Sequence, residues 1–224
     1  MAGILGRKVG MTSMFDKQGR LTPVTVIEAG PCSVLATKTK DKDGYCATVF
    51  GYEDVKESKV TKPKKGWFKK IKSSPKKVVR EMRSDVNSTD KPGDSVLVTS
   101  FKVGDYLDIS GFSKGKGFQG GVKRWKWAGG ESGHGSMFHR APGSIGASSY
   151  PSRVFKGQHL PGHMGSVKRT VQSIRIMIID EEKNLLVVEG SVPGHKNTLL
   201  VIKHAKKRKA KEEAQKTPEK SKGK

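Results

Sequence analysis

A glycine motif in the middle of the chain has the spacing of a nucleotide-binding loop. Residues 111–127 read GFSKGKGFQGGVKRWKW, in which Gly115-x-Gly117-x-x-Gly120 matches the dinucleotide fingerprint. That fingerprint needs a strand before it, a helix after it and an acid about 20 residues downstream for the ribose. The segment after Gly120 has poor helix composition, and Glu131 comes too early. A P-loop is excluded as well, because no Ser or Thr follows the Gly-Lys pair. We therefore expect no cofactor and no small-molecule substrate.

Histidines raise two further chemical possibilities. His134 and His139 lie five residues apart, and His159 and His163 lie four apart, which suits one face of a helix. A proline and a glycine separate the second pair, and no Cys or acid cluster completes a zinc site, so we expect no metal. A Ser-His couple such as Ser136 with His139 has no third group to orient it. Paired carboxylates are absent from the same region, and we expect no enzyme.

Binding of a polyanion explains the glycine motif better. Glycine lets the backbone approach a ligand closely, and the five cations of residues 111–127 can neutralise phosphates. Trp125 and Trp127 offer planar faces for bases, and such stacking contributes roughly 1–3 kcal/mol per base. The alternative for Trp127 is that it covers the rim of a folded body. Basic, glycine-rich loops with aromatic residues are typical of segments that become ordered on RNA.

Positive charge is concentrated in three parts of the chain. The 224 residues carry a net charge of +23. Residues 56–80 contain eleven Lys/Arg and one acidic residue, and residues 113–169 contain ten Lys/Arg and one acidic residue. Residues 203–224 contain ten Lys/Arg and three acidic residues. Repulsion disfavours compaction of such segments without a polyanion. The apolar runs are too short to span a membrane, the N-terminus is no secretion signal, and the two cysteines form no CxxC pair. We therefore expect a cytoplasmic protein without a membrane partner.

The nearly neutral segments have the composition of short β-strands. They are rich in Val, Ile, Thr and aromatic residues, are separated by turn residues, and show no amphipathic helical stripe. Within one of them, Ile174, Ile176 and Ile178 are expected to share a face. Many short strands predict a β-barrel or a β-sandwich. The expected strands are 21–28, 32–39, 45–50, 95–101, 106–109, 171–179, 185–189 and 198–202.

Two of the basic segments lack the residues for a core. Residues 113–169 hold 13 of the 27 glycines and few aliphatic side chains. A loop of that length is usually functional or ordered by a partner. The segment 203–224 has no apolar stripe, and we expect it to be disordered in the free protein.

Several motifs resemble the bacterial form of the family of the universal third protein of the large ribosomal subunit. They are SKGKGF at 113–118, VKRW at 122–125, HRAPGSIG at 139–146, VFKG at 154–157 and PGHMG at 161–165. The segment GILGRKVGMT at 3–12 resembles the family's amino terminus. The resemblance extends in order over residues 1–202.

This resemblance implies a mainly β fold with a six-stranded β-barrel body built from residues 1–112 and 167–202. A small α+β region is inserted at about 56–90, a long irregular basic extension covers 113–166, and 203–224 form a basic tail. It implies a structural constituent of the large subunit that binds 23S rRNA near its 3′ end, contacts neighbouring ribosomal proteins and nucleates subunit assembly. The extension's tip, at about 144–151, is expected near the peptidyl transferase centre without doing its chemistry.

The candidate rRNA-binding residues follow from the extension. Its cations are assigned to phosphates, its aromatic rings to bases, and its tip to recognition by shape. A nucleoid-associated DNA-binding protein is the alternative, but duplex grooves are usually read by helices or ribbons rather than by a glycine-rich extension. The phosphate candidates are Lys114, Lys116, Lys123, Arg124, Lys126, Arg140, Arg153, Lys156, Lys168 and Arg169; the base candidates are Trp125, His139 and His163; the tip residues are Ser144, Ile145 and Gly146.

Overall fold

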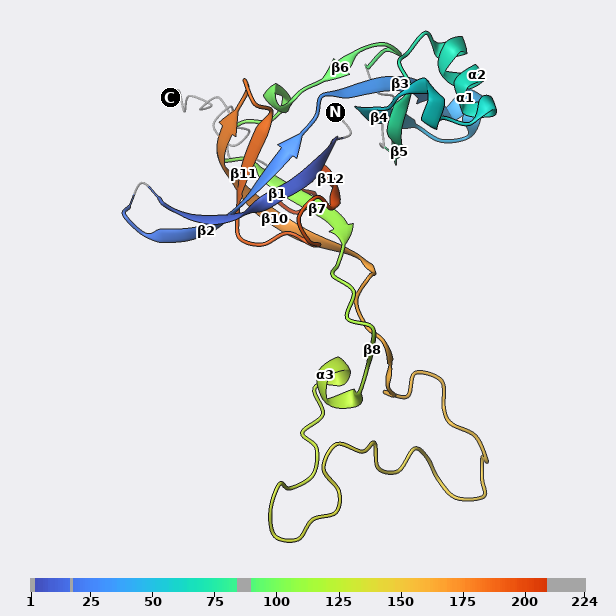
Figure 1. Ribbon diagram of the computed structural model, residues 1–224, viewed down its shortest axis with the longest axis vertical. Helices are drawn as coiled ribbons and strands as arrows, with labels where there is room; N and C mark the ends of the chain where they lie inside the picture. Colours follow the sequence, from blue (N-terminus) through green and yellow to red (C-terminus); the bar gives the residue numbers. More distant parts are fainter. Residues whose placement is uncertain (1–2, 17, 84–89, 209–224) are drawn as a thin grey trace, which may run out of the picture. The chain divides into compact units, whose positions relative to one another are not determined.

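The chain divides into two compact units in the computed structural model, which describes residues 3–16, 18–83 and 90–208. The first unit comprises residues 1–112 and 168–224, and the second is Ser113–Val167. Strands dominate the described residues (Figure 1), which confirms the predicted mainly β class. No helix among these residues is both long and apolar enough to cross a membrane.

Six strands of the first unit hydrogen-bond in a closed ring. Each pairs antiparallel with two neighbours, so the ring has no free edge. Side chains alternate between buried and less buried along β7, β11 and β12, as expected for strands with one face on a core. In ring order the strands are β1 (Ile4–Phe15), β12 (Leu199–His204), β7 (Tyr106–Phe112), β10 (Lys168–Asp180), β11 (Leu185–Glu189) and β2 (Leu21–Ala29).

One expected face along β10 is interrupted. Ile174 and Ile176 are buried, but Ile178 is 43% exposed. The pairing of β10 with β11 shifts register between Ile176 and Ile178. Such an irregularity reverses the side-chain alternation. The prediction that all three isoleucines share a face is therefore wrong for Ile178.

A second sheet in the same unit has four strands and carries short helices. Its order is β5 (Lys76–Arg83), β4 (Ala47–Asp54), β3 (Cys32–Lys38) and β6 (Ser95–Val96). The helical turns are α1 (Lys40–Asp43), η1 (Glu57–Lys59), α2 (Lys62–Ile71) and η2 (Val98–Ser100). Helix α2 begins with a proline in its first turn, ends at Lys72 in the left-handed conformation and buries only Phe68. A helix that buries one side chain has no apolar stripe, so composition alone did not predict it, and only the α+β region at about 56–90 implied by the family resemblance allowed for a helix here.

The predicted ends of several elements also need correction. The strand expected over 95–101 stops at Val96 and is followed by η2. Strand β12 continues through His204, Ala205 is buried, and Arg208 lies over the Tyr106 ring at 5.1 Å. The first residues of the expected disordered tail therefore belong to the folded unit. The rest of that tail, 209–224, lies outside the described residues, as do 84–89 of the expected insertion.

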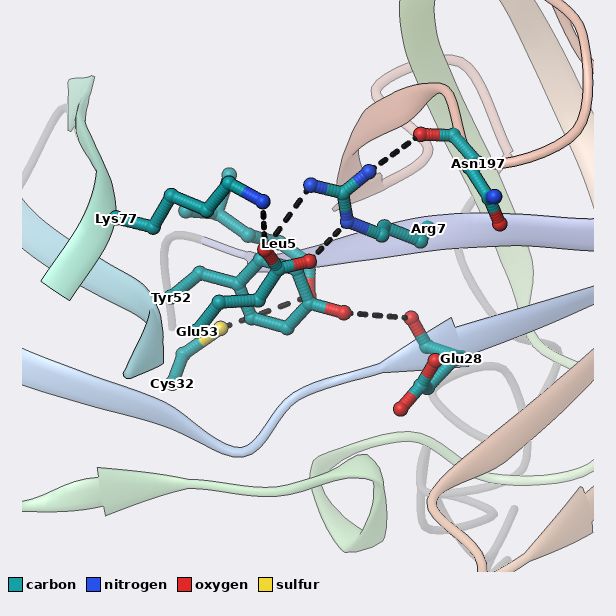
Figure 2. Close-up of polar contacts among 8 residues, drawn as sticks. All are labelled: Leu5, Arg7, Glu28, Cys32, Tyr52, Glu53, Lys77 and Asn197. Atoms are coloured by element: carbon teal, nitrogen blue, oxygen red, sulfur yellow. Dashed lines mark hydrogen bonds and ion pairs between the residues drawn. The ribbon is translucent and has the colours of Figure 1, made fainter. Parts of the chain in front are cut away.

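Arg7 joins the ring to the second sheet (Figure 2). Its Nε donates to one oxygen of Glu53, its Nη2 donates to the other at 3.0 Å, and its Nη1 donates to the Asn197 carbonyl at 2.7 Å. Lys77 Nζ lies 3.3 Å from Glu53 Oε2. The hydrogen bond from Arg7, with help from Lys77, lowers the pKa of the Glu53 carboxyl. The backbone of Glu53 has a positive φ of 58°, which is uncommon for a residue other than glycine.

The second unit is built differently. Its regular elements are β8 (Phe118–Gln119), α3 (Gly121–Trp125) and β9 (Gly162–His163), and the remaining residues form irregular backbone. Gly121 is its only buried residue. The prediction that this segment cannot build a core of its own is confirmed.

Candidate nucleic-acid interface

The glycine motif lies in a narrow antiparallel stem at the base of the second unit. Ser113 N donates to Val167 O at 3.0 Å, Lys116 N donates to Met164 O at 2.9 Å, and β8 pairs with β9. Gly165 has φ at +80°, and a Cβ there would lie 2.2 Å from the Lys114 carbonyl. The glycines of this region therefore let one backbone strand lie against the other.

A short helix does follow the motif, contrary to the sequence prediction. Helix α3 starts directly after Gly120, which caps it without a side-chain hydrogen bond. The helix has five residues, and the strand before the motif's last glycine has two. A dinucleotide site instead needs a strand, a full helix and a parallel crossover. The glycine motif therefore belongs to a short antiparallel stem followed by about one turn of helix, and not to a dinucleotide-binding unit.

The side chains of Arg124 and Trp125 hydrogen-bond to the backbone of a segment about 35 residues further along the extension. Trp125 Nε1 donates to the Leu160 carbonyl at 2.9 Å, and Arg124 Nη1 donates to the same oxygen at 2.7 Å. The His159 ring stacks on the Trp125 ring at a centroid distance of 4.1 Å. Gly162 leaves room for the Arg124 guanidinium, since a Cβ there would lie 2.5 Å from Nη1. We call Arg124, Trp125, His159 and Leu160 the clasp.

Contacts within the clasp leave its side chains with less free surface for RNA. One face of Trp125 is covered by His159, although 38% of the residue remains exposed. His159 entered the sequence analysis only as half of a metal pair. No spacing rule connects it with Trp125, so its role was not visible in the sequence. Trp127 is likewise engaged within the extension, because a Cβ on Gly121 would lie 2.1 Å from its ring.

His139 is tied to its own loop. Its Nδ1 lies 2.8 Å from the Glu131 carbonyl, and its own carbonyl accepts from Gly130 N at 2.9 Å. Ser136 Oγ donates to the Phe138 carbonyl at 2.9 Å rather than to the imidazole, so the structure shows no Ser-His couple here. Among the described residues, no group of three or more His, Cys, Asp or Glu side chains is arranged to hold a metal.

The tip is exposed to solvent, apart from the half-buried Pro151 at its end. Every residue from 137 to 150 is exposed, and Ile145 is 45% exposed although it is apolar. Ser144 Oγ donates to the Gly146 carbonyl at 3.0 Å, which closes a small turn. The three predicted tip residues therefore form one local structure.

The remaining predicted cations divide between the two units. Seven are exposed side chains of the extension, and within the described part of the chain no carboxylate lies within 4.0 Å of their charged groups. Lys168 and Arg169 instead belong to β10, where they pair with Phe112 and Gly111 of β7. His163 is exposed in β9, opposite Phe118. The seven are Lys114, Lys116, Lys123, Lys126, Arg140, Arg153 and Lys156.

Comparison with known proteins identifies relatives over almost the whole chain. The family model described as "Ribosomal protein L3" matches residues 86–185. A protein of Brachyspira pilosicoli named large ribosomal subunit protein uL3 is 46% identical over 211 residues, which are 94% of this chain and 97% of that protein. The protein of the same name from Carboxydothermus hydrogenoformans is 49% identical over 92% of this chain and 98% of its own length. The protein of the same name from Natranaerobius thermophilus is 50% identical over 89% of this chain and 94% of its own length.

Identity at this level across nine-tenths of both chains extends far beyond the short motifs of the extension. It includes the strands of the ring, the second sheet and the basic extension together. The chain therefore belongs to the ribosomal protein L3 family.

Proposed function

We propose that the second unit is an rRNA-penetrating extension and that the first unit anchors it on the large ribosomal subunit. The chain is a structural ribosomal protein rather than an enzyme, as its family is. The observation that carries the proposal is the extension's combination of seven exposed, unpaired cations with a single buried residue. An enclosing polyanion can supply both the counter-charge and the packing that this unit lacks.

The closed ring of six strands is, on this proposal, a β-barrel body to which the extension is joined through the chain. Both strands of the extension's base continue from ring strands, since β7 ends at Phe112 and β10 begins at Lys168. The partner is the 23S rRNA near its 3′ end, together with neighbouring ribosomal proteins. The tip at Ser144, Ile145 and Gly146 lies near the peptidyl transferase centre, and the chain nucleates subunit assembly.

Salt-dependent binding tests this function. The extension variant replaces Lys123, Lys126 and Lys156 with Gln in the full chain, and the control variant replaces the exposed Lys91, Lys183 and Lys196 of the first unit. Each lost phosphate contact should reduce the slope of log K against log salt by about 0.7–0.9, so the extension variant should lose roughly 2–3 in slope on a 23S rRNA transcript. Equal slopes for the two variants would contradict the proposal.

Sedimentation of a native lysate tests the DNA-binding alternative. The chain should sediment with large subunits from a native lysate and should not sediment with sheared DNA. Membership in a ribosomal family favours the first outcome. Cosedimentation with DNA alone would favour the nucleoid function instead.

A further inference from the structure

Two adjoining cavities of the first unit form a basic groove on the body. The first, of about 420 Å³, lies between β5 and the ring strands β7, β10 and β12. The second, of about 390 Å³, lies between β5 and helix α2. Both are lined by Arg80 and Leu199, so they meet at these two residues. We call the combined surface the β5 groove.

Cations outnumber carboxylates along the β5 groove. Seven lysines and arginines line it, against Glu81 and Asp108. Both carboxylates make further contacts of their own. Lys38 Nζ lies 3.0 Å from Glu81 Oε2, while Asp108 accepts hydrogen bonds from the backbone N–H groups of Ser173 and Lys206 at 2.9 and 3.3 Å. With seven cations against these two carboxylates, the groove keeps a net positive charge.

Four of the seven cations make no ion pair within 4.0 Å with any described residue. They are spread along the whole groove rather than gathered at one point. Arg80 stands where the cavities meet, with Lys64 on the side of α2 and Lys168 and Lys206 on the side of the ring. Strand β5 lines both cavities and, with eight residues, is about 26 Å long at 3.3 Å per residue, so the groove along it is extended.

The floor of the β5 groove is apolar. Met82 is 1% exposed, and Leu199 and Val201 are half-buried beside it. Phe112 is 55% exposed in the first cavity, which His204 also lines, and Trp67 is 37% exposed in the second, so each cavity has at least one accessible aromatic ring. An apolar floor strengthens attraction between the cations and an anion, because it lowers the local dielectric. The aromatic rings add surfaces on which a base or ribose can stack.

We propose that the β5 groove binds a ribose-phosphate strand of RNA, as a second RNA-binding surface separate from the extension. This proposal rests on the proposed rRNA-binding function and assigns it a further site on the body. An extended row of cations over an apolar floor, with an aromatic ring in each cavity, matches a polymer of phosphates and bases. A protein segment could pair with the free edge of β5, but only an acidic one would suit the charge.

The test is binding of the full chain to a 23S rRNA transcript over a range of salt concentrations. The groove variant replaces Lys64, Arg80 and Lys206 with Gln, and the Lys91, Lys183 and Lys196 variant is its matched control. We expect the groove variant to lose roughly 2–3 in the slope of log K against log salt, and the control to lose less than one. A variant with Arg80→Lys alone keeps the charge and should retain the wild-type slope.

Combination with the extension variant separates this proposal from the proposed function. If both variants lower the slope and their effects add, the groove and the extension are independent RNA sites. If the extension variant alone lowers it, the groove proposal is overturned while the proposed function stands, and an acidic protein segment becomes the better occupant. If the groove variant alone lowers it, the groove binds RNA and the extension does not. Protection of rRNA from hydroxyl radicals should shrink at different nucleotides in the two variants, and identical losses would overturn a separate site.

Discussion

The imidazole of His159 lies flat on the indole of Trp125, with ring centroids 4.1 Å apart and planes inclined by 7°. The Trp125 indole also donates to the Leu160 carbonyl, so this pair holds helix α3 to the irregular segment that leads back to β9. A stacked aromatic pair contributes about 0.5–1.5 kcal/mol beyond its buried area. That is a large contribution in a unit with one buried residue. The clasp therefore gives the extension local order through side chains rather than through a core.

Removal of the His159 ring should uncover Trp125. In a chain with Trp67 and Trp127 replaced by Phe, His159→Ala should raise the iodide quenching constant of Trp125 fluorescence by about twofold, since one face becomes accessible. The control is His134→Asn, because His134 is exposed and Asn tolerates its φ of 55°. Equal quenching in the two variants would mean that the stack does not persist in solution.

Replacement of Gly165 should open the stem. Gly165 and Gly157 have nearly the same φ, +80° and +84°, but a Cβ on Gly165 would lie 2.2 Å from Lys114 O, whereas nothing lies within 4 Å of one on Gly157. Gly157→Ala should therefore cost only the backbone penalty of about 1–2 kcal/mol, and Gly165→Ala should also break the stem. Hydrogen exchange at the amides of Lys116 and Met164 measures this. We expect at least tenfold faster exchange in Gly165→Ala alone, and similar rates in both variants would refute the steric explanation.

The strands that were predicted correctly are encoded by their local sequence. Strand β11 has the predicted bounds, and β2 extends one residue beyond them, because β-branched runs in these segments end at turn residues. Strands β1 and β5 were not predicted. Several residues of β1 are exposed polar or glycine positions, and β5 consists largely of charged residues. Their pairing with β2 and β4 decides their conformation, and a single-sequence pattern does not contain it.

The candidate site was predictable as a segment and less so as individual contacts. Glycine content, charge and the lack of aliphatic residues marked the extension correctly as a unit without a core. Arg124 and Trp125 were chosen because their chemistry suits RNA, and in the structure they also hold the clasp. Their partners His159 and Leu160 are distant in sequence, so only the fold brings them together. The same holds for Arg80 and Lys206, which meet in one cavity from β5 and from the segment after β12.

The two cysteines should differ in reactivity. Burial raises the pKa of Cys32 to about 11, and its Sγ lies 3.5 Å from the Leu5 carbonyl, with none of the residue exposed. At pH 8 only about one molecule in a thousand carries a Cys32 thiolate. Iodoacetamide should therefore label the half-buried Cys46 of the native chain and leave Cys32 unmodified, whereas both should react in urea. Peptide mass mapping reads the result, and native labelling of Cys32 at its urea rate would show that the core opens readily.

The Arg7–Glu53 pair should make stability depend on pH in a defined direction. Its hydrogen bonds lower the folded-state pKa of Glu53, so its stabilisation is present above the unfolded value of about 4.3 and is lost as pH falls through the folded value. Glu53→Gln should lower the free energy of unfolding by about 1–3 kcal/mol at pH 7 and by less at pH 3, which lies below the unfolded-state pKa of Glu53. Urea unfolding followed by circular dichroism at pH 7, 5 and 3 measures this difference. The exposed Glu181→Gln should change the free energy by less than about 0.5 kcal/mol throughout. A loss for Glu53→Gln that stays constant with pH would show that the charge of the carboxylate does not stabilise the fold.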